Sequence, residues 1–314
     1  MGDGRDTRYL RASRELFLST FGVNRAGFES WVTDRLVSLL EEEEVRAGEA
    51  LFSAGDLPEF LYFMREGGVR LIHDGHGTRR LEGRHVLGLT DGLLDRSRTR
   101  TAIAATNLHL MKLRIDAWLE LLDDSFDLAR ATVLELARSV AELEERLDTF
   151  EEARGLVAAR GPMLMPGRVP SGHLNVIERL ALLMDVPLLR GSGVQPLSDL
   201  AAASQEVYFE RGGTIFDRGV PRDRVFVVVE GEIEASREGP DLVRRVCAGE
   251  VVCGAAAFGE PAVAWRARAA TQGRALAFRV DDWFDRMEEH FDMVRSALSA
   301  LSLRREQLLD ELDR

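Results

Sequence analysis

The sequence predicts an α+β protein built from two tandem β jelly-roll (double-stranded β-helix) domains, each flanked by helices. Three observations lead to this fold class: a long internal repeat, short strand-like stretches separated by turn residues, and apolar helical patterns before and after each set of strands. Many short strands at regular spacing, framed by helices, are typical of small β-barrels and jelly rolls.

The internal repeat is the strongest of these observations. Residues 52–69 read FSAGDLPEFLYFMREGGV, and residues 216–233 read FDRGVPRDRVFVVVEGEI. The offset is 164 residues here and becomes 165 between RIDAWLELLDDSFDL and RVDDWFDRMEEHFDM, as a one-residue difference in loop length would produce. Two duplicated domains explain this better than a solenoid, whose repeats are about 20–50 residues long. We therefore expect one strand order in both halves, with Gly67 and Gly231 at equivalent turns.

Each half follows the same succession of elements. An apolar period of three to four residues opens both halves and predicts a helix; it is carried by Phe28, Trp31, Val32, Leu36, Leu39 and Leu40, and later by Ile177, Leu180, Leu182 and Leu183. Stretches rich in Val, Ile, Phe and Tyr follow, separated by Gly, Asp and Pro, and these predict strands. The Asp74-Gly75 pair indicates a hairpin turn. A helix then closes each half.

A long helix is predicted between the halves, at residues 127–153. Its apolar residues alternate spacings of four and three, which is a heptad stripe; they are Ala129, Val133, Leu136, Val140, Leu143, Leu147 and Phe150. Two alternatives remain open: the stripe is a homodimer seam, or it packs within the chain on the first barrel and on helix 291–312. The next segment, 154–172, is rich in Pro and Gly and predicts a linker. The two domains are then 1–126 and 173–314.

The order of these motifs resembles a known family. Each half reads helix, G-x-x-(L/I)-F-x-x-G, an aromatic strand, (E/D)-G-x-V, a stretch like Arg-Ala-Ala-Thr, and a closing helix. This resembles the cyclic nucleotide-binding domain, the sensor module of cAMP-receptor transcription factors and of protein kinase A regulatory subunits. The resemblance covers roughly residues 25–150 and 173–314. A cyclic nucleotide is the only cofactor that it implies.

The resemblance also implies a phosphate-binding cassette. In this family a Gly-Glu pair precedes a short helix whose N–H groups face the cyclic phosphate; the Glu accepts the ribose 2′-hydroxyl, and an Arg about ten residues later pairs with the phosphate. The first-half stretch is 83–106, where Gly88 matches the glycine but Leu89 stands in the place of Glu. Arg98 and Arg100 are both candidates for the phosphate arginine, and their alternation with Thr is equally typical of an exposed strand face.

The second-half stretch, GEVVCGAAAFGEPAVAWRARAATQ, allows two alignments. One places Gly254 at the cassette glycine and an alanine at the Glu position. The other uses Gly259 and Glu260, followed eight residues later by Arg268. Counting back from RVDDW puts Arg268 in the next strand, level with Ile103 of the first half. We therefore prefer the first alignment, in which the cassette is degenerate.

Composition and charge exclude several other classes. A net charge of −12 argues against a nucleic-acid contact driven mainly by phosphates. No apolar run approaches the ~20 residues that span a bilayer, and the N-terminus lacks the apolar stretch of a secretion signal. Two cysteines fit a reducing cytoplasm. The scattered histidines form no metal-ligand pair, and no nucleophile elbow, Walker loop or HExxH segment is present.

These observations predict a non-enzymatic, cytoplasmic regulatory or scaffold protein without catalytic or metal-binding residues. Its pockets are expected to be degenerate for cAMP and cGMP, and it is expected to act through protein partners and as a homodimer, without nucleic acid or membrane. The alternative is a functional sensor of a cyclic mono- or dinucleotide that signals through its C-terminal helices. The residue after the cassette glycine separates the two hypotheses, because a lost acceptor leaves the ribose hydroxyl unpaired.

Overall fold

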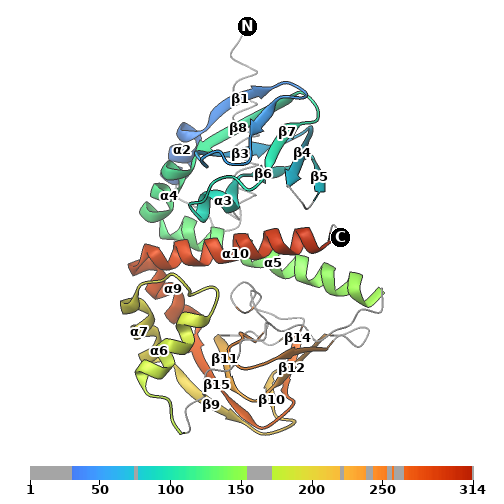
Figure 1. The fold of residues 1–314 in the computed structure, drawn as a ribbon. Coiled ribbons are helices and arrows are strands. Elements are labelled where there is room, and N and C mark those ends of the chain that lie inside the picture. The colour runs from blue at the N-terminus through green and yellow to red at the C-terminus, as the bar shows by residue number, and fades with distance from the viewer. Residues whose placement is uncertain are drawn as a thin grey trace. The chain divides into compact units, whose positions relative to one another are not determined.

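The computed structural model describes residues 30–73, 77–153, 172–219, 223–237, 243–252, 257 and 265–312. The chain forms two compact units, which divide within one long helix, between Glu135 and Leu136. In both units antiparallel sheets combine with helices, so the predicted α+β class with two tandem domains is confirmed (Figure 1).

The first unit has two four-stranded antiparallel sheets, with orders β1-β8-β3-β6 and β2-β7-β4-β5. The strands are β1 (Glu41–Val45), β2 (Ala50–Phe52), β3 (Phe60–Met64), β4 (Gly68–His73), β5 (Gly77–Glu82), β6 (His85–Leu87), β7 (Thr101–Ala104) and β8 (Leu108–Arg114). The helices are α2 (Ser30–Leu39), α3 (Leu89–Leu93), α4 (Ile115–Asp124) and the start of α5 (Phe126–Ala153). The predicted turn at Asp74-Gly75 lies outside the described residues, but the strands on either side of it pair as expected.

The core of the first unit follows from strand alternation. Successive side chains of a strand point to opposite faces of the sheet, and in β3 both faces are apolar. Leu61 and Phe63 are buried on one face, and Met64 is buried on the other within the barrel cluster. That cluster consists of Val45, Met64, Val69, Leu87, Ala102, Ala104, Leu108 and Leu110. A sheet that is apolar on both sides needs helices as well as a second sheet to cover it.

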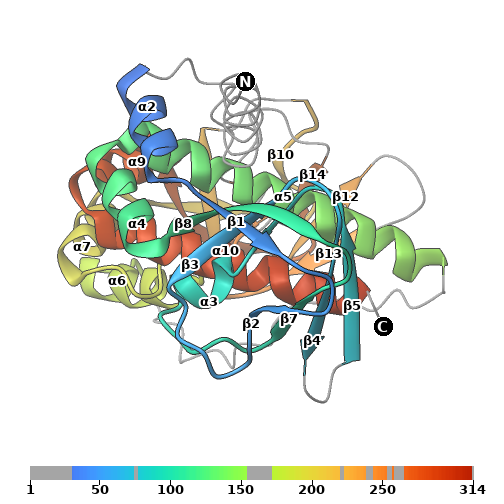
Figure 2. The same ribbon diagram turned by 90° about the horizontal axis from the view of Figure 1, so that it is seen from above.

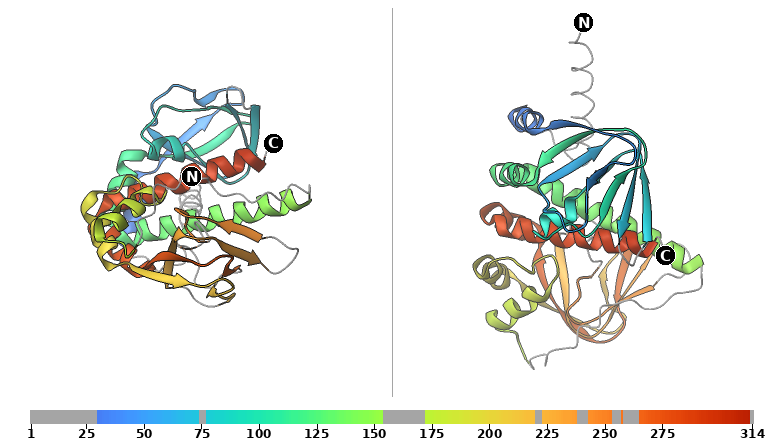
Figure 3. Two further views of the ribbon diagram at one scale, coloured as in Figure 1. Left: turned by 60° about the horizontal axis from the view of Figure 1, so that its bottom comes forward. Right: turned by 45° about the horizontal axis from the view of Figure 1, so that its top comes forward.

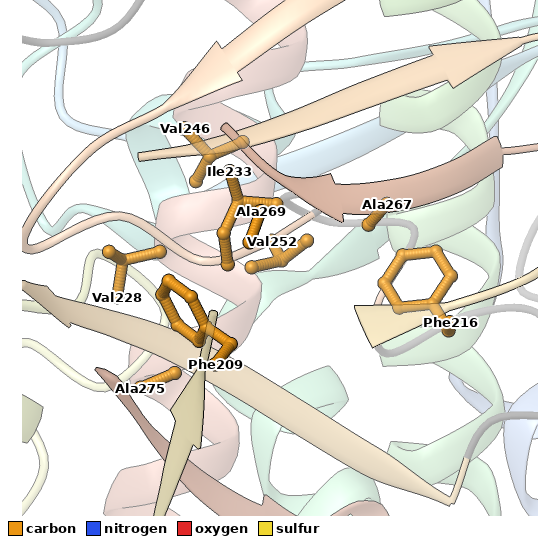
Figure 4. Close-up of a cluster of buried hydrophobic side chains, with 9 residues drawn as sticks. All are labelled: Phe209, Phe216, Val228, Ile233, Val246, Val252, Ala267, Ala269 and Ala275. Atoms are coloured by element: carbon orange, nitrogen blue, oxygen red, sulfur yellow. The ribbon is translucent and has the colours of Figure 1, made fainter. Parts of the chain in front are cut away.

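The second unit repeats this plan. Its sheets have the orders β11-β15-β9 and β10-β14-β12-β13. The strands are β9 (Gln205–Phe209), β10 (Thr214–Phe216), β11 (Arg224–Glu230), β12 (Ile233–Arg237), β13 (Val243–Val246), β14 (Trp265–Ala269) and β15 (Gly273–Arg279), and the helices are α6 (Val176–Asp185), α7 (Val194–Ala203), α9 (Val280–Glu289) and α10 (Phe291–Leu312). Figure 4 shows the buried cluster between its two sheets, in which Phe209 and Phe216 are the largest side chains.

The two units share one strand order, as the repeat predicted. Read in the same direction, β9-β15-β11 corresponds to β1-β8-β3, and β10-β14-β12-β13 corresponds to β2-β7-β4-β5. One difference remains among the described residues: the counterpart of β6 is a single bridge between Val227 and Val251. Gly67 and Gly231 lie at equivalent turns, with φ of 92° and 89°. A left-handed backbone at a close approach requires glycine there.

The heptad stripe of α5 is buried in this structure. Its described members are between 0% and 8% exposed; they are Ala129, Val133, Leu136, Val140, Leu143 and Leu147. Within the second unit, Glu144 of α5 binds Arg304 of α10 at 3.2 Å, and the Arg305 guanidinium donates to Ser139 at 3.1 Å (Figure 3, green and red helices). The described part of the stripe is therefore interior packing in this structure, which favours the alternative in which it packs within the chain. The homodimer stays a prediction.

One other prediction about the chain path remains untested. The predicted linker, 154–172, lies outside the described residues except for Gly172. Beyond it, α6 begins with a capping box in which the Asn175 side chain accepts from the Glu178 N–H while the Glu178 side chain accepts from the Asn175 N–H. Such reciprocal capping satisfies two otherwise unpaired helix donors.

Candidate functional site

The candidate site of the first unit is the segment between β6 and β7. Gly88 precedes α3 and has a φ of 85°, a left-handed conformation that favours glycine. Leu89 is the first residue of α3 and is half-buried. A Cβ on Gly92 would lie 2.4 Å from Cδ1 of Ile115 at the start of α4. Glycine at this position therefore allows α3 to approach α4 closely.

Arg98 joins this segment to the adjacent strand. Its Nη1 donates to the Gly88 carbonyl at 2.7 Å, and its Nη2 donates to the Phe60 carbonyl at 2.6 Å. The guanidinium carbon lies 4.5 Å from the centroid of the Phe52 ring. The residue is 3% exposed. Arg98 is thus a buried cross-link between the start of the cassette and β3, with one guanidinium face on an aromatic ring.

The charge of Arg98 is buried at a cost. Burial lowers the pKa of Arg98 from its usual value, and the charge of Asp91 opposes this shift. The Nε of Arg98 is buried and has no hydrogen-bond partner within the part of the chain that the structure describes. A buried donor without a partner costs free energy. Of the three guanidinium nitrogens of Arg98, Nε is the one without a hydrogen-bond partner among the described residues.

Asp91 organises the loop that returns from α3 to β7. Its carboxylate accepts from Arg96 Nε at 2.7 Å, and from the N–H and hydroxyl of Thr99, each at 3.2 Å. Asp95, between these groups, has a φ of 48° and is the only non-glycine with positive φ among the described residues. Asp tolerates this left-handed conformation better than most residues. Asp91 therefore fixes the loop that carries Arg98.

The backbone of Arg98 is fixed as well. Its N–H donates to the Asp56 carbonyl at 2.8 Å, and its carbonyl accepts from the Gly55 N–H at 2.9 Å. The turn that contains these two residues is itself closed by the Ser53 N–H, which donates to the Asp56 carboxylate at 2.7 Å. The backbone of Arg98 is thus held at both its N–H and its carbonyl, and this fixes where the guanidinium lies.

The other predicted site residues lie in different surroundings. Arg100 is 9% exposed, so the interpretation of both arginines as an exposed strand face is wrong. Gly254, Gly259 and Glu260 lie outside the described residues. Arg268 is an exposed residue of β14, opposite Thr214 of β10 and Glu234 of β12.

This placement of Arg268 repeats that of Ile103 in the first unit. Ile103 on β7 lies opposite Ala50 of β2 and Arg70 of β4, in the corresponding register. The structure therefore brings together Gly88 and Arg98 in the first unit and leaves Arg268 on an outward strand position in the second.

Comparison of the sequence with models of known protein families identifies the family of this chain. The model of the cyclic nucleotide-binding domain matches residues 42–125 and 206–290, together more than half of the chain. The chain belongs to the cyclic nucleotide-binding domain family. Two tandem domains of this family support a regulatory or sensor role, and such domains are generally non-catalytic. A cyclic nucleotide is consistent with them as a ligand. No curated protein matches the sequence.

Solved structures of the family are similar over most of the chain. The regulatory domain of Toxoplasma gondii protein kinase A, solved with cAMP, is 16% identical, with 95% of this chain and 97% of that chain covered and a TM-score of 0.34. The regulatory subunit of a cAMP-independent protein kinase A from Trypanosoma brucei is 17% identical, with coverages of 94% and 90% and a TM-score of 0.35.

A sensor domain shows the same likeness over a shorter length. The sensor domain of the transcriptional regulator DNR from Pseudomonas aeruginosa is 19% identical over 44% of this chain and 96% of that chain, with a TM-score of 0.39.

The sequence did not indicate which residues contact Arg98. The carbonyl of Phe60 and the ring of Phe52 carry no signal in the sequence that links them to Arg98, because the link is tertiary. The contact between Asp91 and Arg96 carries no helical signal either, because α3 ends at Leu93, before Arg96. In the described residues no group of three or more His, Cys, Asp and Glu side chains could hold a metal, and no helix is long and apolar enough to cross a membrane.

Proposed function

We propose that this protein is a non-enzymatic, cytoplasmic regulatory or scaffold protein that acts through protein contacts, and that its first domain no longer binds cAMP or cGMP tightly. One observation carries the proposal. At the cassette, Leu89 occupies the first position of α3, where the family resemblance places an acceptor for the ribose 2′-hydroxyl, and both Nη nitrogens of Arg98 donate to backbone carbonyls.

The energetic argument concerns the ribose and the phosphate separately. A nucleotide bound against Leu89 would leave its 2′-hydroxyl desolvated and unpaired, at roughly 1–3 kcal/mol. That corresponds to about one to two decades of affinity. A phosphate at Arg98 would have to share a guanidinium that already binds the Gly88 and Phe60 carbonyls and stacks on Phe52. Both parts of the ligand would therefore be recognised poorly.

The second domain adds support from the position of Arg268. This arginine is an exposed mid-strand residue of β14 that lies opposite Glu234 of β12. We propose that it takes no part in nucleotide binding. Gly254, Gly259 and Glu260 remain candidates for a cassette in that domain.

A variant that restores the missing acceptor tests the proposal. Leu89→Glu returns the carboxylate, so we expect it to gain about one decade or more of affinity for cAMP over the unchanged chain. Leu89→Met, of similar volume and without a strong hydrogen-bond acceptor, is the matched control. An unchanged chain that already binds cAMP at micromolar concentration, with no gain from Leu89→Glu, would contradict the proposal.

A working sensor is the second candidate function, and a specific observation favours it. The Nε of Arg98 is buried and has no partner in the described part of the chain, and an anion is the group that would satisfy it. A thermal-shift screen of cyclic mono- and dinucleotides tests this candidate. A ligand at 100 times its Kd adds about 2.7 kcal/mol of apparent stability, and the absence of any shift would reject it.

A further inference from the structure

The sheet β2-β7-β4-β5 of the first unit, whose strands Figure 2 shows, carries a pair of arginines opposite one another on β4 and β5. Arg70 on β4 lies directly opposite Arg80 on β5. Residues directly opposite one another point to the same face of a sheet, and both side chains are exposed. Their neighbours Val69 and Leu81, also opposite one another, belong to the barrel core. The arginines therefore point away from the core.

The sheet itself makes no use of the charge of Arg70. Like charges directly opposite one another destabilise a pair of strands. Arg80 is partly compensated by Glu82, whose carboxylate lies 2.7 Å from its Nε on the open surface. The side chain of Arg70 has no hydrogen bond or ion pair within the described part of the chain. The positive charge of Arg70 therefore lowers the stability of the sheet.

The duplicated domain provides an internal reference for this face. The residue equivalent to Arg70 in the second domain is Glu234, which lies opposite both Arg245 and Arg268. The Nε of Arg245 is 3.8 Å from the Glu234 carboxylate. There a carboxylate stands between two guanidiniums, so the charges alternate. In the first domain the carboxylate is replaced by Arg70, and Ile103 takes the place of Arg268.

Two isoleucines complete the outward face of the first domain. Ile103 lies opposite Arg70, and Ile72 is the next residue of β4 on the same face. Both are only half-buried, whereas their equivalents in the second domain are Arg268 and Ser236. Arginine is enriched in protein interfaces, and the two half-buried isoleucines add apolar surface beside it.

We propose that this face, formed by Arg70, Ile72, Arg80 and Ile103 and called here the Arg–Ile face, binds a segment of a partner protein that carries carboxylates and an apolar side chain. A carboxylate between Arg70 and Arg80 restores the alternation that Glu234 provides in the second domain. The apolar side chain covers the isoleucines. The net charge of −12 disfavours a polyanion such as a nucleic acid more strongly than a short segment with a few carboxylates. Exposed charges of this kind mainly set association rate and salt dependence.

The proposal names a surface for the protein contacts proposed above, and it rests on that part of the proposed function. It does not depend on the cassette, because the state of the cassette is read separately by nucleotide calorimetry on the same sample. If the cassette binds cAMP and the Arg–Ile face also binds the peptide, the result contradicts only the proposal that the first domain has lost tight nucleotide binding.

The test uses the full chain and a fluorescein-labelled synthetic peptide of alternating Glu and Leu residues. We expect measurable binding by fluorescence anisotropy, a loss of about tenfold or more in affinity with Arg70→Glu, and a similar loss at about 1 M salt, where the Debye length is about 3 Å. Arg70→Glu places a carboxylate opposite Arg80, as Glu234 lies opposite Arg245. We therefore expect its Tm to equal or exceed that of the unchanged chain.

The mirror-image variant is the matched control. Glu234→Arg gives the second domain the like-charge pair without the isoleucines, so it should lower Tm and leave peptide affinity unchanged. The proposal is overturned if the peptide does not bind, if Arg70→Glu binds it equally well, if Arg70→Glu lowers Tm, or if a Lys-Leu peptide or a DNA oligonucleotide binds the face instead. Amide shifts confined to β4, β5 and β7 on addition of the peptide support it, and shifts elsewhere contradict it.

Discussion

The contacts of Arg98 serve the fold of the first domain. Its two Nη nitrogens donate to carbonyls on different elements, and Asp91 fixes the loop that carries it without touching the guanidinium. Hydrogen bonds from charged donors stabilise by about 1.5–3 kcal/mol each. A residue with this geometry contributes to the stability of the first domain whether or not a nucleotide binds.

Replacing Arg98 by alanine should therefore destabilise the first domain. We expect a loss of about 3 kcal/mol in the free energy of unfolding, because the Gly88 and Phe60 carbonyls lose their donors. Urea denaturation measures it, with Arg84→Ala, at an exposed residue, as the control within about 0.5 kcal/mol. Unchanged stability combined with a lost micromolar nucleotide affinity would mean that Arg98 is a ligand residue.

The turn at Gly67 gives a second prediction for a single residue. Its φ is 92°, and a Cβ there would lie 2.5 Å from Leu108 Cδ2 and 2.7 Å from Thr106 Oγ1. We expect Gly67→Ala to lower the free energy of unfolding by about 2–3 kcal/mol, from backbone strain plus the clash. Gly48→Ala has a similar φ with nothing within 4 Å, so it isolates the strain. Equal losses for the two variants would remove the clash from the explanation.

Glu206 is a buried carboxylate of β9 that binds the start of the second domain at Leu174. Its side chain is 3% exposed. It accepts from the Leu174 N–H at 2.7 Å and from Arg274 Nη1 at 3.1 Å. Burial raises the pKa of Glu206, but the hydrogen bonds from Leu174 and Tyr208 and the charge of Arg274 outweigh it, so the pKa is lowered from its usual 4.5. The equivalent pair in the first domain, His109 and Glu42, is more exposed.

The sign of this shift fixes a pH dependence. A carboxylate whose pKa is lower in the folded state contributes stability that is fully present above about pH 4.5 and is lost as pH falls through the folded pKa. Glu206→Gln should therefore cost about 3 kcal/mol at pH 7, by breaking a buried pair, and progressively less below pH 4.5. Unfolding curves at several pH values measure it, with the exposed Glu210→Gln as control. A difference between the variants that is constant with pH would contradict this account.

At the scale of elements, α5 belongs to both units, and its stripe is interior. The sequence predicted the helix and the stripe but left open what covers them. A heptad pattern records only that one face is apolar, and a second copy or the same chain can cover it equally well. Glu144 decides this in the structure, since it binds Arg304 of α10 at 3.2 Å and lies 3.5 Å from Arg244 of β13.

A variant of the stripe distinguishes the two outcomes. Leu143→Asp buries an unpaired carboxylate in the second unit, so we expect it to destabilise the fold by at least about 3 kcal/mol without changing a native mass measured by light scattering. Glu142→Asp, at the neighbouring exposed position, is the control. If the mass halves while stability is unchanged, α5 forms a seam between copies after all.

At the scale of the whole molecule, duplication made most of the fold predictable. The constant offset fixed which strands correspond, and the glycines at the turns required left-handed conformations in both copies, so strand order followed. The contacts of Arg98 could not be predicted, because Phe52 and Phe60 come to it only when the barrel closes. The single bridge at Val251, in place of the longer β6, also carried no signal, since both stretches contain apolar residues suited to a strand. The geometry of the candidate site depends on such tertiary contacts, whereas the positions of helices and strands in the sequence depend on them less.

Calorimetric titration of cAMP and cGMP into the unchanged full chain tests the central claim most directly. Because Leu89 cannot accept the ribose hydroxyl and Arg98 is held by two carbonyls, we predict no binding tighter than high micromolar to the first domain, and none that depends on Arg268. A micromolar or tighter Kd that Arg98→Lys weakens would show that the first cassette is functional. A micromolar Kd abolished by Arg268→Ala would show that the second cassette includes Arg268.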